Sequence, residues 1–206
     1  MNKKIEVELR GPITKEQFDR LESLFEKDGK FIDHKDRVLI CYPDPDTGSF
    51  VEECFTDIRV RTTNGTPEMI IKLGKWGGDN ENRRELSLMG KPGEFDKMVV
   101  MMAALGHKKG VWAVRKGKVF DYKEVEFSLV EVPDHSYYYE AEIMVEEVSK
   151  AKAARVKMEK LCKELNLEVF DDDGFYGYIN RLNKESNKEF LFEKYSEGFF
   201  KKEFGI

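Results

Sequence analysis

The feature that most constrains the fold of this chain is a two-residue alternation of apolar and charged side chains. It first appears over residues 5–10, where Glu6, Glu8 and Arg10 alternate with apolar residues. Successive side chains of a β-strand point to opposite faces, so this alternation predicts a strand with one apolar and one charged face. From residue 37 onward the alternation predicts seven further strands, near 37–43, 53–63, 67–74, 82–89, 111–119, 121–131 and 137–146.

Residues that favour turns separate the predicted strands. Gly11-Pro12 is expected to end the first strand, and Asn64-Gly65 is a two-residue hairpin signal. Further turns are expected at 43–48, at 77–80 and at Gly117. Short turns join consecutive strands into antiparallel pairs, and eight such strands favour a closed barrel or a two-sheet sandwich.

Helices are expected before, between and after the strands. Thr14 and Gln17 form a capping-box pattern that predicts the start of the first helix. Apolar residues at helical spacing predict further helices over 93–105, 146–165, 174–184 and 186–202. The chain has no internal repeat or low-complexity linker, so its 206 residues suit one domain. We expect that domain over residues 1–185, with a helical extension packed on it over residues 186–206.

Composition excludes several classes of function. The net charge of -5 argues against general nucleic-acid binding, which is typical of basic proteins. No apolar run approaches the roughly 20 residues that a membrane span needs. The N-terminus lacks the apolar centre of a signal peptide, so we expect a cytoplasmic protein without membrane contact. The three cysteines and three histidines are scattered, which favours neither a disulfide framework nor a zinc site.

The sign of the charge on the strand faces changes along the chain. Two arrangements agree with this pattern: half-buried strands with their charged faces in water, or a barrel with its charged faces turned inward. An inward arrangement would set an acidic patch against a basic wall and would leave helices to cover the outer apolar faces. The carboxylates lie in the first and last strands, at Glu6, Glu8, Glu140 and Glu142, and the cations lie between them, at Arg59, Arg61 and Lys72.

The order of these charged motifs resembles that of the CYTH domain, or triphosphate tunnel metalloenzyme family. The likeness covers roughly residues 3 to 183, and six motifs follow one another in the family's order. The segment 178–182 resembles the aromatic-to-leucine segment near the family's end. The matching residues are Glu6, Glu8 and Arg10 for the opening ExExK motif, Arg59 and Arg61 for the RxR strand, Lys72 for the lone strand lysine, Arg83 with Glu85, then Arg115, and Glu140 with Glu142 for the closing ExE strand.

The chain departs from the family pattern at two positions. Arg10 stands where the opening motif has lysine, and Ser128 stands where the family usually has an aspartate. Glu126, two residues earlier on the same face, is a candidate substitute for that aspartate. Two registers stay open, since Arg84 could replace Arg83 and Lys116 could replace Arg115.

The resemblance implies an α+β fold: an eight-stranded antiparallel β-barrel, the triphosphate tunnel, covered by helices and followed by a helical C-terminal segment. It implies that Glu6, Glu8, Arg10 and Glu85 act in catalysis, with Glu85 either a metal or water ligand or a partner for a neighbouring arginine. Carboxylate ligands suit hard divalent cations. The implied Mg²⁺ or Mn²⁺ ligands are Glu6, Glu8, Glu140 and Glu142, and the implied triphosphate-binding residues are Arg10, Arg59, Arg61, Lys72, Arg83 and Arg115.

Three functions are compatible with this resemblance. Metal-dependent hydrolysis of a small-molecule triphosphate is expected first, with inorganic, nucleoside or thiamine triphosphate as substrate. A class IV adenylyl cyclase is the alternative, although cyclase-type members often carry a His-Phe pair before the first motif, where this chain has only residues 1–4. A non-catalytic module that binds a phosphorylated ligand is the third. The sequence leaves open whether the protein is a monomer or a homodimer.

Overall fold

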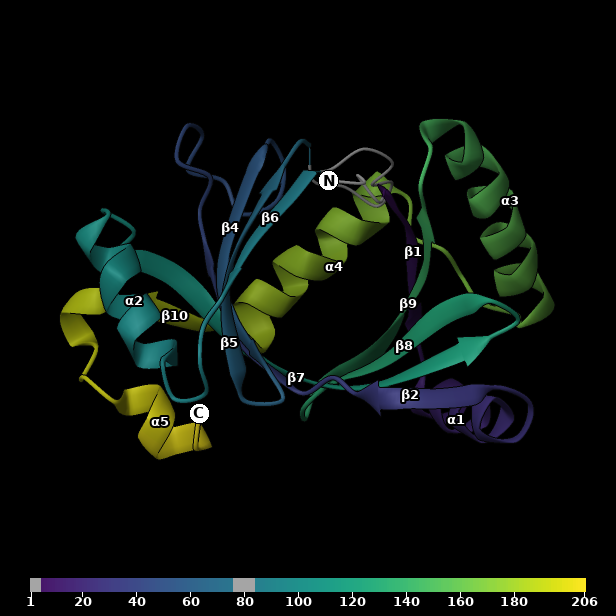
Figure 1. Ribbon diagram of the computed structural model, residues 1–206, viewed down its shortest axis with the longest axis horizontal. Helices are drawn as coiled ribbons and strands as arrows, with labels where there is room; N and C mark the ends of the chain where they lie inside the picture. The colour runs from purple at the N-terminus through teal and green to yellow at the C-terminus, as the bar shows by residue number, and fades with distance from the viewer. Residues whose placement is uncertain (1–4, 76–83) are drawn as a thin grey trace.

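The strands form one curled antiparallel sheet in the computed structural model, which describes residues 5–75 and 84–206 (Figure 1). The main path runs β1-β9-β8-β7-β3-β4-β5-β6, and β2 and β10 both pair with β7. The sheet curls into a half-barrel, which confirms the predicted α+β class. The strands are β1 Ile5–Ile13, β2 Lys30–His34, β3 Arg37–Tyr42, β4 Thr56–Thr63, β5 Thr66–Leu73, β6 Arg84–Met89, β7 Lys109–Tyr122, β8 Val125–Val132, β9 Ser136–Val145 and β10 Lys188–Leu191.

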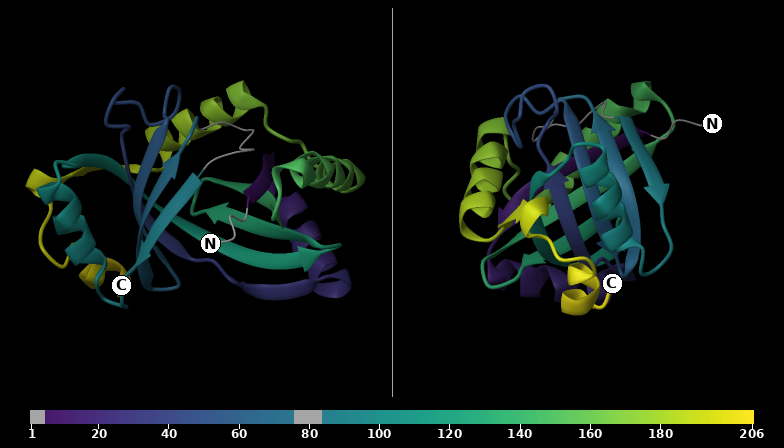
Figure 2. Two further views of the ribbon diagram at one scale, coloured as in Figure 1. Left: turned by 45° about the horizontal axis from the view of Figure 1, so that its top comes forward. Right: turned by 90° about the vertical axis from the view of Figure 1, so that its left-hand side faces the viewer.

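Helices cover the outer face of the sheet and one of its openings. Thr14 caps α1 as predicted, because its side chain accepts from the Gln17 N–H while the Thr14 N–H donates to the Gln17 side chain. Helices α1 and α3 pack outside one half of the sheet, α2 and α5 pack outside the other, and α4 lies across an opening between them (Figure 2). The helices are α1 Lys15–Asp28, α2 Phe95–Ala104, α3 Val148–Glu164, α4 Asp172–Glu185 and α5 Phe199–Phe204, with a 3-10 turn, η1, at Phe192–Lys194.

Two apolar cores lie on the outer, convex side of the sheet. One joins β1, β8 and β9 to α1 and α3 through buried residues such as Leu9, Phe127 and Met158. The other joins β3 and β4 to α2 and the C-terminal segment through residues such as Val60 and Phe200. Burial of these apolar surfaces stabilises the convex side, so the charged faces of the same strands point inward. The structure therefore selects the inward arrangement of the two that the sequence allowed.

The curled sheet remains open between its two edge strands, β1 and β6. Within residues 5–75 and 84–206, β1 pairs only with β9, and β6 pairs only with β5. One side chain reaches across the opening from β5, since Lys72 Nζ lies 3.8 Å from Glu6 Oε2 of β1. The tunnel expected from the sequence is thus a half-barrel, not a barrel closed by backbone pairing. Within the same residues, no helix is both long and apolar enough to cross a lipid bilayer.

Two expected strand ends are wrong, and close backbone approaches explain both. The first strand continues through Gly11-Pro12 to Ile13, and a Cβ on Gly11 would lie 1.8 Å from the carbonyl oxygen of Glu168. Strand β7 continues through Gly117, where a Cβ would lie 3.1 Å from Lys35. These glycines permit chains to pack closely against a strand, so they do not mark turns. The predicted hairpin at Asn64-Gly65 is confirmed.

The helix expected over 186–202 is also wrong. Lys188–Leu191 instead forms β10, which pairs with the start of β7. The chain then forms η1, and Gly198 has a left-handed φ of 76° before α5 begins. Asp96 of α2 accepts from the N–H groups of Phe200 and Lys201, which anchors the start of α5. The open edge of β7 offers backbone partners that a separate helix would leave unpaired.

Candidate functional site

Carboxylates form a row across the concave face of β1, β9 and β8. Glu8 lies directly opposite Glu142, and Glu142 lies directly opposite Glu126. Like charges opposite each other on neighbouring strands repel. Burial, and then the neighbouring Glu6 and Glu8, raise the pKa of Glu142 to about 8. This row is a place where a cation would be strongly favoured.

Arg10 binds the carboxylates on either side of it. Its Nε donates to Glu8 Oε1 at 2.8 Å, its Nη2 bonds the second Glu8 oxygen, and its Nε lies 3.5 Å from Glu140 Oε1. Burial opposes the charged form of Arg10, but Glu8 and Glu140 outweigh it and raise its pKa. Burial likewise opposes ionisation of Glu140, yet Arg10 and then Arg37 lower its pKa below the usual range. Burial raises the pKa of Glu8, despite the opposing effect of Arg10.

Cations of β4 and β5 form the opposing wall. The Nε and Nη2 of Arg59 donate to the two oxygens of Asp57, at 2.7 and 2.6 Å. Arg61 donates from Nε to Glu68 at 2.5 Å.

Lys72 is the third cation of this wall, and its Nζ lies 2.9 Å from Glu85 Oε2. Burial opposes ionisation of Glu85, but Lys72 lowers its pKa. Glu85 thus forms an ion pair with a lysine, whereas the sequence suggested a neighbouring arginine as its partner.

Two basic residues of the concave face were missed from the sequence. Lys35 lies between β2 and β3, and its Nζ is 3.4 Å from both Glu126 Oε1 and Ser128 Oγ. Arg37 opens β3 and shares its inward face with Leu39 and Cys41. The alternation Arg37-Leu39-Cys41 could have identified Arg37, but Lys35 precedes the strand and carries no such signal.

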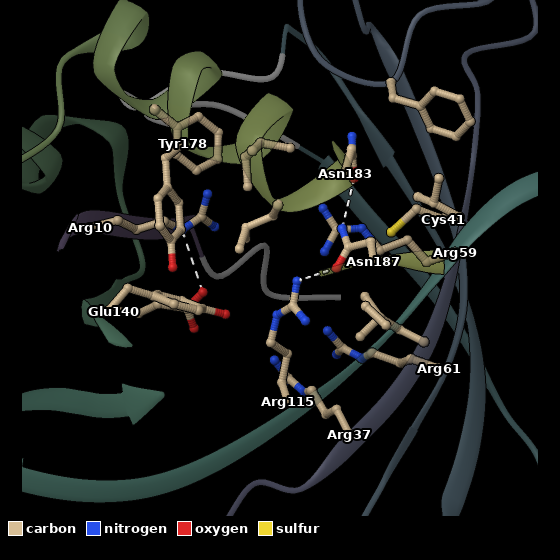
Figure 3. A pocket seen from close by; sticks show the side chains of 18 of the residues that line it. Arg10, Arg37, Cys41, Arg59, Arg61, Arg115, Glu140, Tyr178, Asn183 and Asn187 are labelled. Carbon is tan, nitrogen blue, oxygen red and sulfur yellow. Dashed lines mark hydrogen bonds and ion pairs between the residues drawn. The ribbon is translucent and has the colours of Figure 1, made fainter. Parts of the chain in front are cut away.

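The arginines of both walls meet in a cavity of about 120 Å³ (Figure 3). Helix α4 lines its other side with Phe175, Tyr178 and Asn183. The Arg10 guanidinium lies 5.2 Å from the centre of the Phe175 ring, within the range of a cation–π contact. The five arginines that line the cavity are Arg10, Arg37, Arg59, Arg61 and Arg115.

The structure also places the remaining predicted residues. Arg115 faces the cavity, whereas Lys116 is exposed, so the register that the sequence left open favours Arg115. Arg84 is exposed and lies opposite Leu73, on the outer side of β6. Arg83 lies outside the described residues.

The side chains around the predicted metal position show whether their donor atoms suit a divalent cation. Glu6, Glu8 and Glu142 supply only oxygen ligands, and their mutual repulsion is the kind that a hard cation relieves. Arg10 binds both oxygens of Glu8 and lies 3.5 Å from Glu140, so Glu6 and Glu142 are the most available of the four predicted ligands. Over residues 5–75 and 84–206, no three carboxylate, histidine or cysteine side chains converge closely enough to hold an ion as they stand. The donor type fits Mg²⁺ or Mn²⁺.

Comparison with known proteins identifies the fold. No family model and no curated relative matches the sequence. Among solved structures, a protein from Pyrococcus horikoshii OT3 is 22% identical with a TM-score of 0.66, over 85% of this chain and 99% of that one. A Hippeastrum protein described as a candidate adenylyl cyclase with dominant triphosphatase activity is 13% identical with a TM-score of 0.56, over 82% of this chain and 90% of that one.

A similar fold also occurs in one chain of a multi-subunit assembly. A chain of the Schizosaccharomyces pombe Mediator head module is 10% identical, with a TM-score of 0.57 over 80% of this chain and 97% of that one. Identities this low show the fold alone. The chain shares the fold of these solved structures, and the activity has to be argued from the site.

Proposed function

We propose that this protein is a member of the triphosphate tunnel metalloenzymes and hydrolyses a small-molecule triphosphate with a divalent cation. One observation carries the proposal: a single concave face sets a row of carboxylates beside a cavity lined by five arginines. A triphosphate is a short chain of anionic oxygens that arginines bind with paired donors. A divalent cation bridges such a chain to carboxylates. The two halves of the site therefore suit the two parts of one metal–triphosphate ligand.

The basic residues orient the triphosphate in this proposal. Arg59 and Arg61 are held in place by Asp57 and Glu68, so their remaining N–H groups face the cavity with little loss of side-chain freedom. Lys72, held by Glu85, supplies a further positive charge near the carboxylate row. Glu6, Glu8 and Glu142 would hold the cation. When bound, the cation neutralises phosphate charge and assists attack on phosphorus.

Arg10 acts as a binding residue and not as a proton acceptor. Its guanidinium stays protonated at any accessible pH, and Glu8 and Glu140 raise its pKa further. The lysine of the family motif could accept a proton with a lowered pKa. This chain has no such group at position 10, so we expect Arg10→Lys to retain much of the activity.

Product analysis tests the proposal. The protein is incubated with inorganic triphosphate, ATP or thiamine triphosphate, each with Mg²⁺ and with Mn²⁺. Metal-dependent release of orthophosphate is the expected result, and it should disappear in excess chelator. Glu142→Gln is the inactive comparison, because it removes the carboxylate at the centre of the row.

Two other outcomes would assign a different function. Pyrophosphate together with a cyclic nucleotide would identify a cyclase, the activity for which the Hippeastrum neighbour is named. Ligand binding without turnover would identify a binding module. That second reading draws on Arg10 and Ser128, which stand where the family pattern has lysine and aspartate.

A further inference from the structure

Charge pairing is uneven among the basic residues of the concave face. Arg10, Arg59, Arg61, Lys72 and Lys35 each contact a carboxylate. Arg37 and Arg115 differ, because no carboxylate of residues 5–75 or 84–206 forms an ion pair with either. Arg37 donates from Nε to Thr63 Oγ1 at 3.3 Å, and Arg115 donates to the Val114 carbonyl and to Asn187 Oδ1. Both partners are neutral, so this part of the cavity keeps two positive charges.

These two arginines also lie directly opposite each other. In the pairing of β3 with β7, Arg37 is in register with Arg115. Like charges at such positions destabilise a sheet, and burial followed by the nearby Arg61 lowers the pKa of Arg37. An anion placed between the two guanidiniums would remove this repulsion, and each guanidinium would offer it paired donors.

The pair belongs to the wall of the arginine-lined cavity. Arg115 is held by Asn187, whose amide nitrogen donates to Asn183 of α4 at 2.7 Å. Figure 3 shows Arg115 beside Asn187, with Arg37 next to Arg115. Tyr138, Tyr178 and Leu182 line the cavity with them. An anionic group bound in this cavity can therefore reach both arginines.

We infer that Arg37 and Arg115 form a subsite that binds the free terminal phosphoryl group of an oligophosphate. The inference rests on the proposed function for the position of the rest of the ligand. A terminal phosphoryl group carries close to two negative charges above pH 7, whereas an internal or esterified one carries one. Two arginines that form no ion pair among the described residues match the terminal group.

Binding measured without turnover tests this subsite. Isothermal titration calorimetry at pH 8 in excess chelator compares inorganic triphosphate with its dimethyl ester, in which both terminal phosphoryl groups carry a methyl group. Arg37→Ala should lower the affinity for inorganic triphosphate by about ten- to a hundredfold, as expected for the loss of one charged contact. The dimethyl ester should bind the natural protein more weakly than inorganic triphosphate does. Arg37→Ala should lower the affinity for the ester by less than about threefold further. Arg37→Lys, which keeps the charge, should recover part of the loss.

Two matched variants control for charge and for general phosphate contacts. Arg181 lies exposed on α4, outside the cavity lining, so Arg181→Ala removes the same charge and should leave both affinities within about twofold. Arg61→Ala should weaken both ligands by similar factors. The unfolding temperature of each variant shows whether it is folded at the temperature of the titration.

The inference is overturned if Arg37→Ala weakens both ligands equally, or if it leaves inorganic triphosphate binding unchanged. Its failure is separable from that of the proposed function. A natural protein that binds triphosphate through Arg37 but releases no phosphate with Mg²⁺ or Mn²⁺ refutes the hydrolysis and leaves the subsite standing. A protein that hydrolyses triphosphate, but whose affinity for triphosphate is unchanged by Arg37→Ala, refutes the subsite and leaves the hydrolysis standing.

Discussion

Asp44 organises the loop between β3 and β4, and its removal has a specific consequence for stability. Its side chain is only 1% exposed. One carboxylate oxygen accepts from the N–H groups of Asp46 and Thr47, at 2.9 and 3.1 Å. The other accepts from those of Phe55 and Thr56, at 2.8 and 2.7 Å. Phe50 of the same loop lines the cavity. The loop leads directly into β4, the strand that contains Arg59 and Arg61.

The size of the effect follows from these four bonds. A hydrogen bond to a charged group contributes about 1.5–3 kcal/mol, and water can replace part of this because three of the four donor residues, Asp46, Thr47 and Phe55, are exposed. We therefore expect Asp44→Asn, which keeps one acceptor and presents an NH₂ group to the other two donors, to lower the free energy of unfolding by about 2–4 kcal/mol at pH 7.

The effect should also depend on pH. Burial opposes ionisation of Asp44, but the hydrogen bonds from Thr56 and the other N–H groups outweigh it and lower its pKa. A lowered folded-state pKa stabilises the protein above the unfolded-state value of about 3.9. This contribution is lost as the pH falls through the folded-state pKa.

Urea unfolding of the natural protein and of Asp44→Asn from pH 8 to pH 3 measures both effects. The difference in unfolding free energy should be constant above about pH 5 and should shrink in acid. Asp46→Asn removes the same charge at an exposed position, and it should cost less than about 0.5 kcal/mol at any pH. The reasoning is refuted if Asp44→Asn is as stable as the natural protein at pH 7, or if the difference does not shrink in acid.

Three further predictions concern the site and the backbone. Glu6→Gln and Glu142→Gln should each remove most of the metal-dependent triphosphate hydrolysis while circular dichroism shows an unchanged fold, and full turnover in excess chelator would contradict the metal role. Arg61→Ala should weaken inorganic triphosphate, ATP and thiamine triphosphate by similar factors, about 1.5–3 kcal/mol in binding free energy. A tenfold difference between substrates in calorimetry would show that Arg61 does not contact the shared phosphates. Gly11→Ala should destabilise the protein by about 3 kcal/mol, because its Cβ would meet the Glu168 carbonyl oxygen at 1.8 Å. Gly177→Ala, in α4 with no atom within 4 Å of the added carbon, should stabilise it by about 0.5–1 kcal/mol in urea unfolding. Equal effects of the two glycine substitutions would contradict the packing described at Gly11.

Much of the candidate site could be predicted because a strand's alternation assigns its faces. The alternation placed Glu8, Arg10 and Glu142 on the charged faces of their strands, and the structure finds them on the concave side. Alternation cannot say which strands become neighbours. The direct opposition of Arg37 and Arg115 depends on β3 pairing with β7, which are separated by several other elements in the chain. Lys35 reaches Glu126 only because the chain crosses β7 closely at Gly117.

The sequence by itself determined the local features of this protein, because these depend on residues a few positions apart. The capping box at Thr14, the hairpin at Asn64-Gly65 and the two-faced strands are of this kind. Only the tertiary structure decided the features that depend on distant partners. Residues 188–191 form a strand because β7 offers them an open edge. The half-barrel stays open because, among the described residues, β1 pairs only with β9 and β6 pairs only with β5. A side chain's direction is a local property of the backbone, whereas its neighbours are chosen by the packing of the whole chain.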